Sequence, residues 1–366
     1  MGCACPRCQS RSFSVKSQSH YDIPKTQTAV VFEKNNAPLQ VRKDWPVTQP
    51  EGLKPGEVLV RLAYSGVCHT DLHTSRLTTN YLWSVVTKVP DTLLQLETTP
   101  TPVSRLATLC QVLANSCLGC EDCRKGHEST CVDGDLHGFT VDGSFEQWCV
   151  SFSDHMTPIP KDLPMHAAAP ILRAGVTVYK ALKEIGGNCG DFVVIPGAGD
   201  GLGHLACQCA RAMGYRVIAI DSGEDKRKLV ASYGIKNFID FKVGNVQQKV
   251  FEASEGRGAH ATVVVASGGE VYKAALSFLR PHGAVMLVGL PKDTYITAEV
   301  FGSAFNAHRI IGSYVGNRQD SIEALKLAAA RDVSTTYKIE KLEKLPDVFE
   351  RMANGKLAGR IVLDCE

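Results

Sequence analysis

The sequence predicts an α/β protein in which a β-rich domain is joined to a doubly wound domain built on a parallel sheet. Two observations predict this fold class. Between about residues 28 and 70, short runs rich in β-branched residues are separated by proline and glycine, which is typical of a mostly antiparallel sheet. From 174 to 316, apolar runs of strand length alternate with helical segments, which is typical of parallel strands joined by crossover helices.

The expected elements follow the chain in order. The β-rich part has strands at 28–33 and 57–67. In the alternating part, the strand segments are nearly continuous apolar runs, as expected for strands buried on both faces, and the segments between them are expected to be helices. These strands are expected at 191–197, 215–221, 261–267, 284–290 and 309–316, and the helices at 201–214, 225–234 and 270–281. The tail adds helices, beginning with one at 320–333, and a last strand within 358–366.

Composition and charge exclude several classes of protein. The chain has 366 residues, 44% hydrophobic and 21% charged, with a formal net charge of +2, which gives no electrostatic argument for a nucleic acid or a membrane surface as partner. No apolar run approaches the roughly 18 residues needed to span a bilayer. The polar start is unlike a signal peptide, so we expect a disordered extension at 1–23 and a cytoplasmic location. Its three cysteines, Cys3, Cys5 and Cys8, offer at most adventitious metal binding.

A glycine-rich turn follows the first strand of the alternating part. It reads PGAGDGLGH from Pro196 to His204, and the next strand ends in Asp221. Glycines let backbone amides approach a pyrophosphate at a helix N-terminus, and a carboxylate about 20 residues further on accepts from an adenosine ribose hydroxyl. The turn therefore predicts a dinucleotide site; the alternative is a turn that only packs helix against sheet. Asp221 favours NAD over NADP because its charge repels a 2′-phosphate. Lys226 either assists at the ribose or is a solvated helix residue.

Asp200 is unusual in this turn. Its carboxylate lies among amides that are expected to face the pyrophosphate, where repulsion would cost on the order of 1 kcal/mol or more. Asp200 therefore either weakens NAD binding or turns outward.

Four of the 14 cysteines are clustered with the spacing CxxCxxCx7C: Cys117, Cys120, Cys123 and Cys131. In a chain without a secretory signal, such spacing indicates metal more often than disulfides. Four thiolates complete a tetrahedral Zn²⁺ site and leave no position for substrate, so this zinc stabilises a loop. We expect a structural zinc lobe at 115–131, which we call the cysteine lobe; the alternative is four reduced, buried thiols.

Several further segments carry a family resemblance. They are YSGVCHTDLH (64–73), DGSF (142–145), GVTVYKALK (175–183), GSYVGNR (312–318) and GRIVLD (359–364). In these segments, the glycine turn and the cysteine lobe, the chain resembles the zinc-dependent medium-chain alcohol dehydrogenases, particularly the tetrameric fungal type. The resemblance covers about residues 24–78 and 114–366. It implies a GroES-like catalytic domain at 24–173 and 317–366, an NAD-binding Rossmann domain at 174–316, two zincs per subunit and a homo-oligomer.

The resemblance also implies roles for single residues. Cys68 would be a catalytic zinc ligand, Thr70 and His73 would relay the alcohol proton to solvent, and His69 would lie near the pyrophosphate. The cofactor would be held at its phosphates by Gly197, Ala198, Gly199, Asp200, Gly201, Leu202, Gly203 and Arg360, and at its nicotinamide by Val288, Gly289 and Leu290.

The sequence departs from the family at the catalytic zinc. The family's second ligand is a histidine about 20 to 25 residues after the first cysteine, but residues 81–114 contain no histidine and no glycine. The third ligand is a cysteine where this chain has Arg173. The GHE at 126–128 lies inside the cysteine lobe, and recruiting its histidine would dismantle that site. A catalytic zinc needs about three protein ligands, whereas Arg173 repels a dication and can pair with Cys68 or Asp71. The block at 81–114 is explained either by divergence or by a changed reading frame or retained intron.

Three functions are compatible with these residues. The first is an NAD-dependent dehydrogenase acting on a small alcohol or aldehyde. The second is a zinc-independent reductase in which Arg173 stabilises developing negative charge. The third is a catalytically inactive homologue that keeps the fold and assembles with an active relative.

Overall fold

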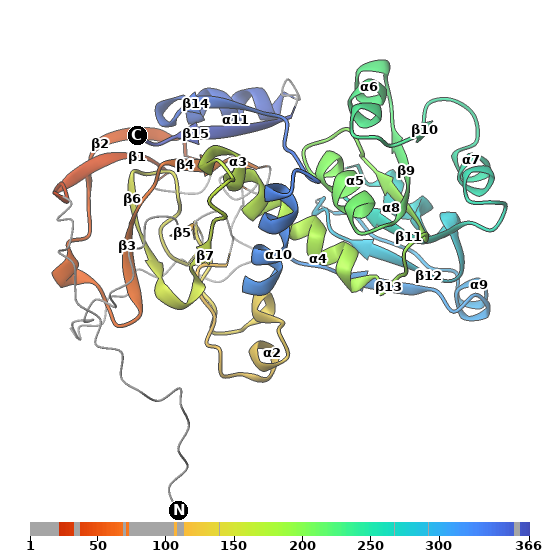
Figure 1. Ribbon diagram of the computed structural model, residues 1–366, viewed down its shortest axis with the longest axis horizontal. Coiled ribbons are helices and arrows are strands. Elements are labelled where there is room, and N and C mark those ends of the chain that lie inside the picture. Colours follow the sequence, from red (N-terminus) through yellow and green to blue (C-terminus); the bar gives the residue numbers. More distant parts are fainter. Residues whose placement is uncertain are drawn as a thin grey trace, which may run out of the picture.

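The computed structural model describes residues 22–32, 37–68, 71–72, 113–138, 140–266, 268–291, 293–354 and 359–366, and the backbone of 106–107. A β-rich part and a part with a parallel sheet lie side by side, with helices α4 and α10 at the junction between them (Figure 1). Among the described helices, none is both long enough and apolar enough to cross a membrane.

The parallel sheet has six strands in the order β10-β9-β8-β11-β12-β13. The strands are β8 (Phe192–Pro196), β9 (Arg216–Asp221), β10 (Asn237–Asp240), β11 (Ala259–Val264), β12 (Leu279–Leu287) and β13 (Arg309–Gly312). From β8 the chain winds outward through β9 and β10, and it then returns to β11 on the other side of β8. This is the predicted doubly wound topology, and its switch point lies between β8 and β11.

Helices connect these strands and bury the sheet. They are α5 (Gly203–Ala212), α6 (Glu224–Ser232), α7 (Val246–Ala253), α8 (Glu270–Ala274) and α9 (Val300–Phe305). Every residue of β8 is buried, as its continuous apolar run predicts. The expected elements did not include β10 and α7. The reason is that β10 has four residues of which one is fully buried, too short an apolar signal to separate from a loop.

The helix predicted at 270–281 is wrong at its end. Helix α8 stops at Ala274, a 3₁₀ turn covers Ala275–Phe278, and β12 already begins at Leu279. Pro281 explains why no helix reaches 281, because a proline disfavours the helical conformation of the residue before it and has no amide to continue the helix.

The β-rich part consists of small sheets. Antiparallel pairs join β1 (Thr26–Val31) to β2 (Gln40–Pro46), β3 (Glu57–Arg61) to β6 (Trp148–Phe152), and β5 (Leu106–Ala107) to β7 (Thr157–Pro158). A further sheet has the order β14-β15-β4, formed by β14 (Tyr337–Lys341), β15 (Arg360–Asp364) and β4 (Tyr64–Gly66). The single strand expected at 57–67 is therefore two strands in different sheets. Because β15 pairs with β4, the C-terminal segment belongs to the β-rich part. Buried residues of β15 and of α11 (Leu345–Ala353) contribute to the hydrophobic core of this part.

The junction between the two parts is formed by α3 (Met165–Pro170), a π-helical turn at Ile171–Gly175, α4 (Val176–Glu184) and α10 (Arg318–Ala329). Helix α10 begins with a capping box in which Asn317 and Asp320 exchange side-chain and backbone hydrogen bonds. At Gly316, a Cβ atom would overlap the side chain of Val176, so glycine is what lets the start of α10 approach α4 so closely. The π-helical turn of this junction carries Arg173, which faces Cys68.

Candidate functional site

The glycine turn lies where the topology predicts a ligand, between the carboxyl end of β8 and the start of α5. The amides of Gly197 and Ala198 donate to the carbonyl oxygen of Ile220, which ties the turn to the end of β9. Gly197 has a φ of +80°, and a Cβ atom on Gly203 would overlap the Gly197 carbonyl oxygen. The turn thus needs glycine at both positions, and the resulting shape fits the close approach of a pyrophosphate.

Asp221 ends β9 beside this turn, with its side chain 5% exposed. One of its carboxylate oxygens accepts from the Gly199 amide at 2.8 Å, and the other accepts from Ser222 N at 2.8 Å and from Lys226 Nζ at 2.8 Å. Lys226 also donates to Asp200 at 2.7 Å. Asp200 therefore turns toward α6, the outward alternative, and its side chain is 47% exposed. Burial alone would lower the pKa of Lys226, but its bonds to Asp200 and Asp221 outweigh burial and raise that pKa.

The residues that the resemblance assigns to the nicotinamide directly follow β12, at the carboxyl end of the parallel strands. The amides of Val288 and Gly289 donate to Val264 at 3.2 and 3.0 Å, and Val288 is buried whereas Leu290 is 67% exposed. Arg360, at the start of β15, donates from Nε to the carbonyl oxygen of Gly201 at 3.0 Å. Burial lowers the pKa of Arg360. The glycine turn, Asp221, Val288 and Arg360 together fit a dinucleotide.

Cys68 faces Arg173, which the π-helical turn carries. Arg173 Nε donates to Cys68 Sγ at 2.9 Å, and a terminal guanidinium nitrogen pairs with Asp71. Asp71 in turn accepts from the Cys68 amide at 2.8 Å. The side chains of Arg173 and Asp71 are only 13% and 14% exposed, so the pair is largely withdrawn from water. We call Cys68, Asp71 and Arg173 the arginine cluster.

The arginine cluster does not fit a zinc ion. Its guanidinium is always cationic and donates to the sulfur that would have to bind the metal. Among the described residues, neither Cys68 nor Asp71 belongs to a group of three or more metal-ligating side chains. Thr70, His73 and His69, and most of 81–114, lie outside the described residues.

The cysteine lobe does fit a zinc ion. The Sγ atoms of Cys117, Cys120, Cys123 and Cys131 all lie within 4.8 Å of one another. Two of the sulfur pairs are 4.0 and 3.9 Å apart, close to the roughly 3.8 Å edge of a tetrahedron with 2.3 Å Zn–S bonds. Backbone amides donate to three of the sulfurs, and amides of Gly119 and Cys120 lower the pKa of Cys117 to about 7. Burial raises the pKa of Cys123 to about 12.

The lobe is anchored to the junction through residues for which the sequence predicted no role. Glu128, buried in the lobe, accepts from the Arg318 guanidinium at 2.8 and 3.1 Å. The buried Lys180 of α4 donates to Ser129 of the lobe at 3.1 Å. His127 of the GHE segment is exposed and precedes the 3₁₀ turn Glu128–Thr130 within the lobe. Glu128 and Arg318 are 190 residues apart, a separation at which no local sequence pattern reveals the pair.

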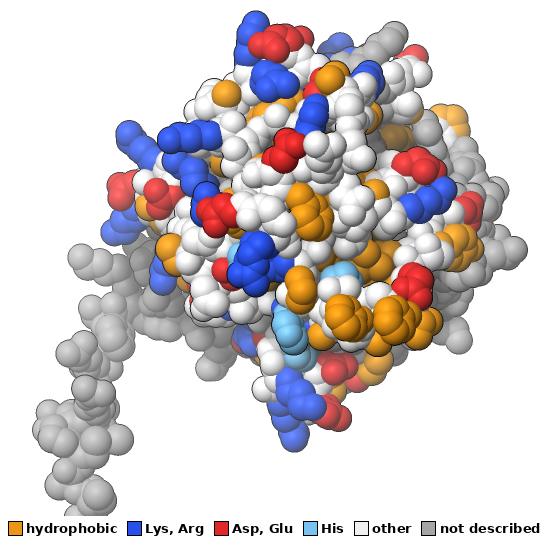
Figure 2. Space-filling model, turned by 90° about the vertical axis from the view of Figure 1, so that its right-hand side faces the viewer, with side chains coloured by type: hydrophobic (Ala, Val, Ile, Leu, Met, Phe, Trp, Pro, Cys, Tyr) orange, Lys and Arg blue, Asp and Glu red, His pale blue; other side chains and the backbone are white. Residues whose placement is uncertain are grey.

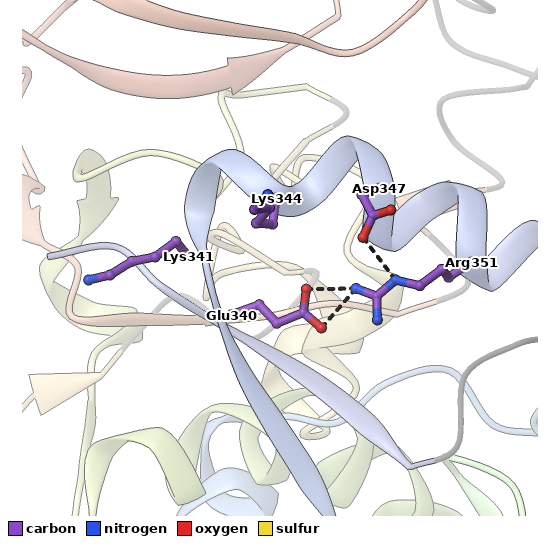
Figure 3. Close-up of a pocket in the computed structure, with 5 residues that line it drawn as sticks. All are labelled: Glu340, Lys341, Lys344, Asp347 and Arg351. Carbon is purple, nitrogen blue, oxygen red and sulfur yellow. Dashed lines mark hydrogen bonds and ion pairs between the residues drawn. The ribbon is translucent and has the colours of Figure 1, made fainter.

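A hollow of about 430 Å³ lies away from these sites, between β14 and α11. Its lining residues are Glu340, Lys341, Lys344, Asp347 and Arg351. Arg351 forms ion pairs with both Glu340, at 2.6 Å, and Asp347, at 3.0 Å (Figure 3). All five lining residues are charged, and Glu340 and Asp347 are already paired with Arg351. The hollow is therefore unlike the mostly hydrophobic and aromatic site of a small organic substrate.

Comparisons with known proteins agree with this architecture. The chain matches the family model of the alcohol dehydrogenase GroES-like domain over residues 54–161 and that of the zinc-binding dehydrogenases over 201–330. It is 40% identical to an alcohol dehydrogenase of Schizosaccharomyces pombe and 39% identical to alcohol dehydrogenase 1 of Emericella nidulans. Each match covers 93% of this chain and 99% of the relative.

Solved structures give the same result. The alcohol dehydrogenase of Aeropyrum pernix superposes with a TM-score of 0.76 at 26% identity, covering 92% of this chain and 99% of that one. An acetophenone reductase of Geotrichum candidum in complex with NAD superposes with a TM-score of 0.76 at 25% identity, covering 94% and 98%. With a GroES-like domain, a Rossmann domain and near full-length identity of about 40% to fungal relatives, the chain belongs to the zinc-dependent medium-chain alcohol dehydrogenase family.

Proposed function

We propose that this protein transfers hydride between NAD(H) and a small alcohol or aldehyde, and that Arg173, in place of a catalytic zinc, stabilises the charge on the substrate oxygen. The observation that carries the proposal is the bond of Arg173 to Cys68, the one residue of the family's zinc ligands that this chain keeps. NAD(H), when bound on the glycine turn, supplies or accepts the hydride.

The residues of this chain would divide the remaining work. Negative charge develops on the carbonyl oxygen as the carbonyl carbon receives hydride, and a cation held in a site shielded from water stabilises that charge strongly. Arg173 is suited to this role because its guanidinium keeps its charge, and Asp71 orients it. A guanidinium donates hydrogen bonds but does not take up a proton, so the alcohol proton needs another path. Thr70 and His73 stay the predicted relay.

The test is turnover of a small aldehyde with NADH by Arg173→Ala and by Arg173→Lys. We expect Arg173→Ala to lose at least about a hundredfold in kcat, the range seen when one oxyanion-stabilising donor is removed. We expect NADH affinity to be unchanged. Arg173→Lys, which keeps the charge but not the fork geometry, should retain more activity. A chelator should not abolish turnover of the original protein at once. Unchanged kcat in Arg173→Ala would contradict the proposal.

The same cluster also favours a second candidate, a homologue without turnover. Arg173 already bonds two anionic or polarisable partners, Cys68 and Asp71, which compete with a substrate oxygen for the guanidinium. For this candidate, the folded protein would bind NADH yet convert neither alcohols nor aldehydes at millimolar concentration. It would also be recovered together with an active relative.

We also propose that the protein forms homo-oligomers through the exposed end of its parallel sheet. Hydrophobic side chains gather on this face (Figure 2), and the large ones around α9 and β13 are 43% to 81% exposed. These residues, the apolar face, are Leu290, Tyr295, Val300, Phe301, Phe305 and Ile310. Strand β13 is the edge of the sheet, and an edge strand that pairs with its own copy about a twofold axis buries both the edge and the apolar face.

Sedimentation velocity tests this assembly. The double variant Phe301→Asp, Phe305→Asp should sediment as a smaller species than the original protein. Val132→Asp is the matched control, because Val132 is 74% exposed but directly follows the cysteine lobe, away from the apolar face. A monomeric original protein, or unchanged assembly of the double variant, would contradict the assignment. The cytoplasmic location stays a prediction.

A further inference from the structure

We propose that Asp200 is a second determinant of cofactor choice. By holding Lys226 against Asp221, Asp200 excludes a 2′-phosphate from the subsite for the adenosine ribose. This inference rests on the proposed cofactor site. It goes beyond the role of Asp221, because Asp200 belongs to the phosphate-facing turn rather than to the end of β9.

The geometry makes Lys226 a bridge between two carboxylates. Its Nζ lies 2.7 Å from Asp200 Oδ1 and 2.8 Å from Asp221 Oδ1. The stem of Lys226 lies across the turn at Gly199, where a Cβ atom would come within 2.7 Å of it. Glycine at that position is therefore what allows the lysine to lie on the turn and reach both carboxylates.

The charges of this bridge decide which cofactor is tolerated. Two carboxylates and one ammonium leave the bridge with one net negative charge, whereas Asp221 and Lys226 alone would be neutral. A third carboxylate, Asp240, lies beside Asp221 in strand register, and hydrogen bonds from the amides of Lys242 and Gly223 lower its pKa. A ribose hydroxyl is neutral and can donate to Asp221. A 2′-phosphate carries up to two negative charges, so the negative charge of this subsite repels it. Lys226 cannot offset this repulsion, because it is already paired with both Asp200 and Asp221.

The neighbouring Arg227 does not remove this imbalance. Arg227, on the same helix as Lys226, lies over the Phe238 ring at 4.6 Å and pairs with Glu224 at 3.7 Å. Glu224 and Arg227 are both substantially exposed, at 64% and 46%, so solvent screens them. Replacing Asp200 by asparagine would make the bridge neutral and release Lys226 from one of its two partners.

The experiment is a fluorescence titration of the purified full chain with NADH and with NADPH, by competition where direct binding does not saturate. We expect Asp200→Asn to lower the Kd for NADPH by about tenfold or more and the Kd for NADH by less than about threefold. Glu224→Gln is the matched control, since it removes a carboxylate from the start of α6 without touching Lys226. It should leave the ratio of the two Kd values unchanged.

A double-variant comparison tests the part played by Lys226. In a Lys226→Met background, Asp200→Asn should gain much less for NADPH, because no lysine is then released to pair with the 2′-phosphate. The inference would be overturned if Asp200→Asn raised the affinity for both cofactors equally or for neither. It would also be overturned if the full rise in NADPH affinity persisted in the Lys226→Met background. If the original protein bound neither cofactor, the cofactor assignment itself would fall. NADH binding with unaltered selectivity in Asp200→Asn would overturn only the role of Asp200.

Discussion

Replacing Arg173 by methionine should lower the free energy of unfolding by about 3 kcal/mol. The side chains of Arg173 and Asp71 are 13% and 14% exposed, so the substitution leaves a largely buried carboxylate without its cation. Removing one partner of a buried ion pair costs about 3–5 kcal/mol, and the slight exposure places this pair at the lower end. With a slope of about 3 kcal/mol per molar urea, the midpoint of unfolding should fall by about 1 M.

The assay is urea unfolding followed by circular dichroism for Arg173→Met, Asp71→Asn and the double variant. The double variant should be more stable than Arg173→Met, because the stranded charge is gone. Arg42→Met is the control: Arg42 bonds Asp44 at 2.8 Å, but the pair is 36% and 70% exposed and should contribute less than about 1 kcal/mol. A loss in Arg173→Met no larger than in the control would refute the description of the arginine cluster as a buried ion pair.

Three further substitutions test other parts of the structure. Gly203→Ala places a Cβ on the Gly197 carbonyl oxygen and should weaken NADH binding at least about tenfold in a fluorescence titration, whereas Gly52→Ala, which meets only an ordinary contact, should not. Burial, reinforced by Asp142, raises the pKa of Glu146 to about 8, so the folded protein holds a proton that the unfolded chain releases near pH 4.5. Stability should therefore fall by roughly 3 kcal/mol from pH 5.5 to 8 in urea titrations, and Glu146→Gln should lack this fall. Cys117→Ser should lose the zinc of the lobe and melt at a lower temperature, as seen by elemental analysis and calorimetry; full zinc retention would contradict the four-cysteine site.

The features that could be predicted from the sequence are those that depend on local sequence patterns. The apolar runs of β8, β9, β11, β12 and β13 alternate with helical segments, so the doubly wound sheet was predictable without β10. The spacing of Cys117 to Cys131 likewise brings four sulfurs together without long-range information. Arg173 could be expected near Cys68 only through the family resemblance, because the two residues are 105 positions apart.

The features that could not be predicted depend on contacts between distant segments. The sequence left two orientations open for the Asp200 side chain. Its orientation depends on where α6 places Lys226, 26 residues away. The pair of Glu128 and Arg318, which docks the cysteine lobe on α10, had no sequence signal at all. The segment expected as one strand at 57–67 divides because its two halves hydrogen-bond to β6 and to β15, strands from distant parts of the chain.

The zinc content of the purified protein tests the central claim most directly. It should be measured by elemental mass spectrometry after exhaustive dialysis. With a loaded cysteine lobe and a guanidinium bonded to Cys68, we predict close to one zinc per chain. Close to two zincs per chain would contradict the account, because a second metal would then have to displace Arg173 from Cys68.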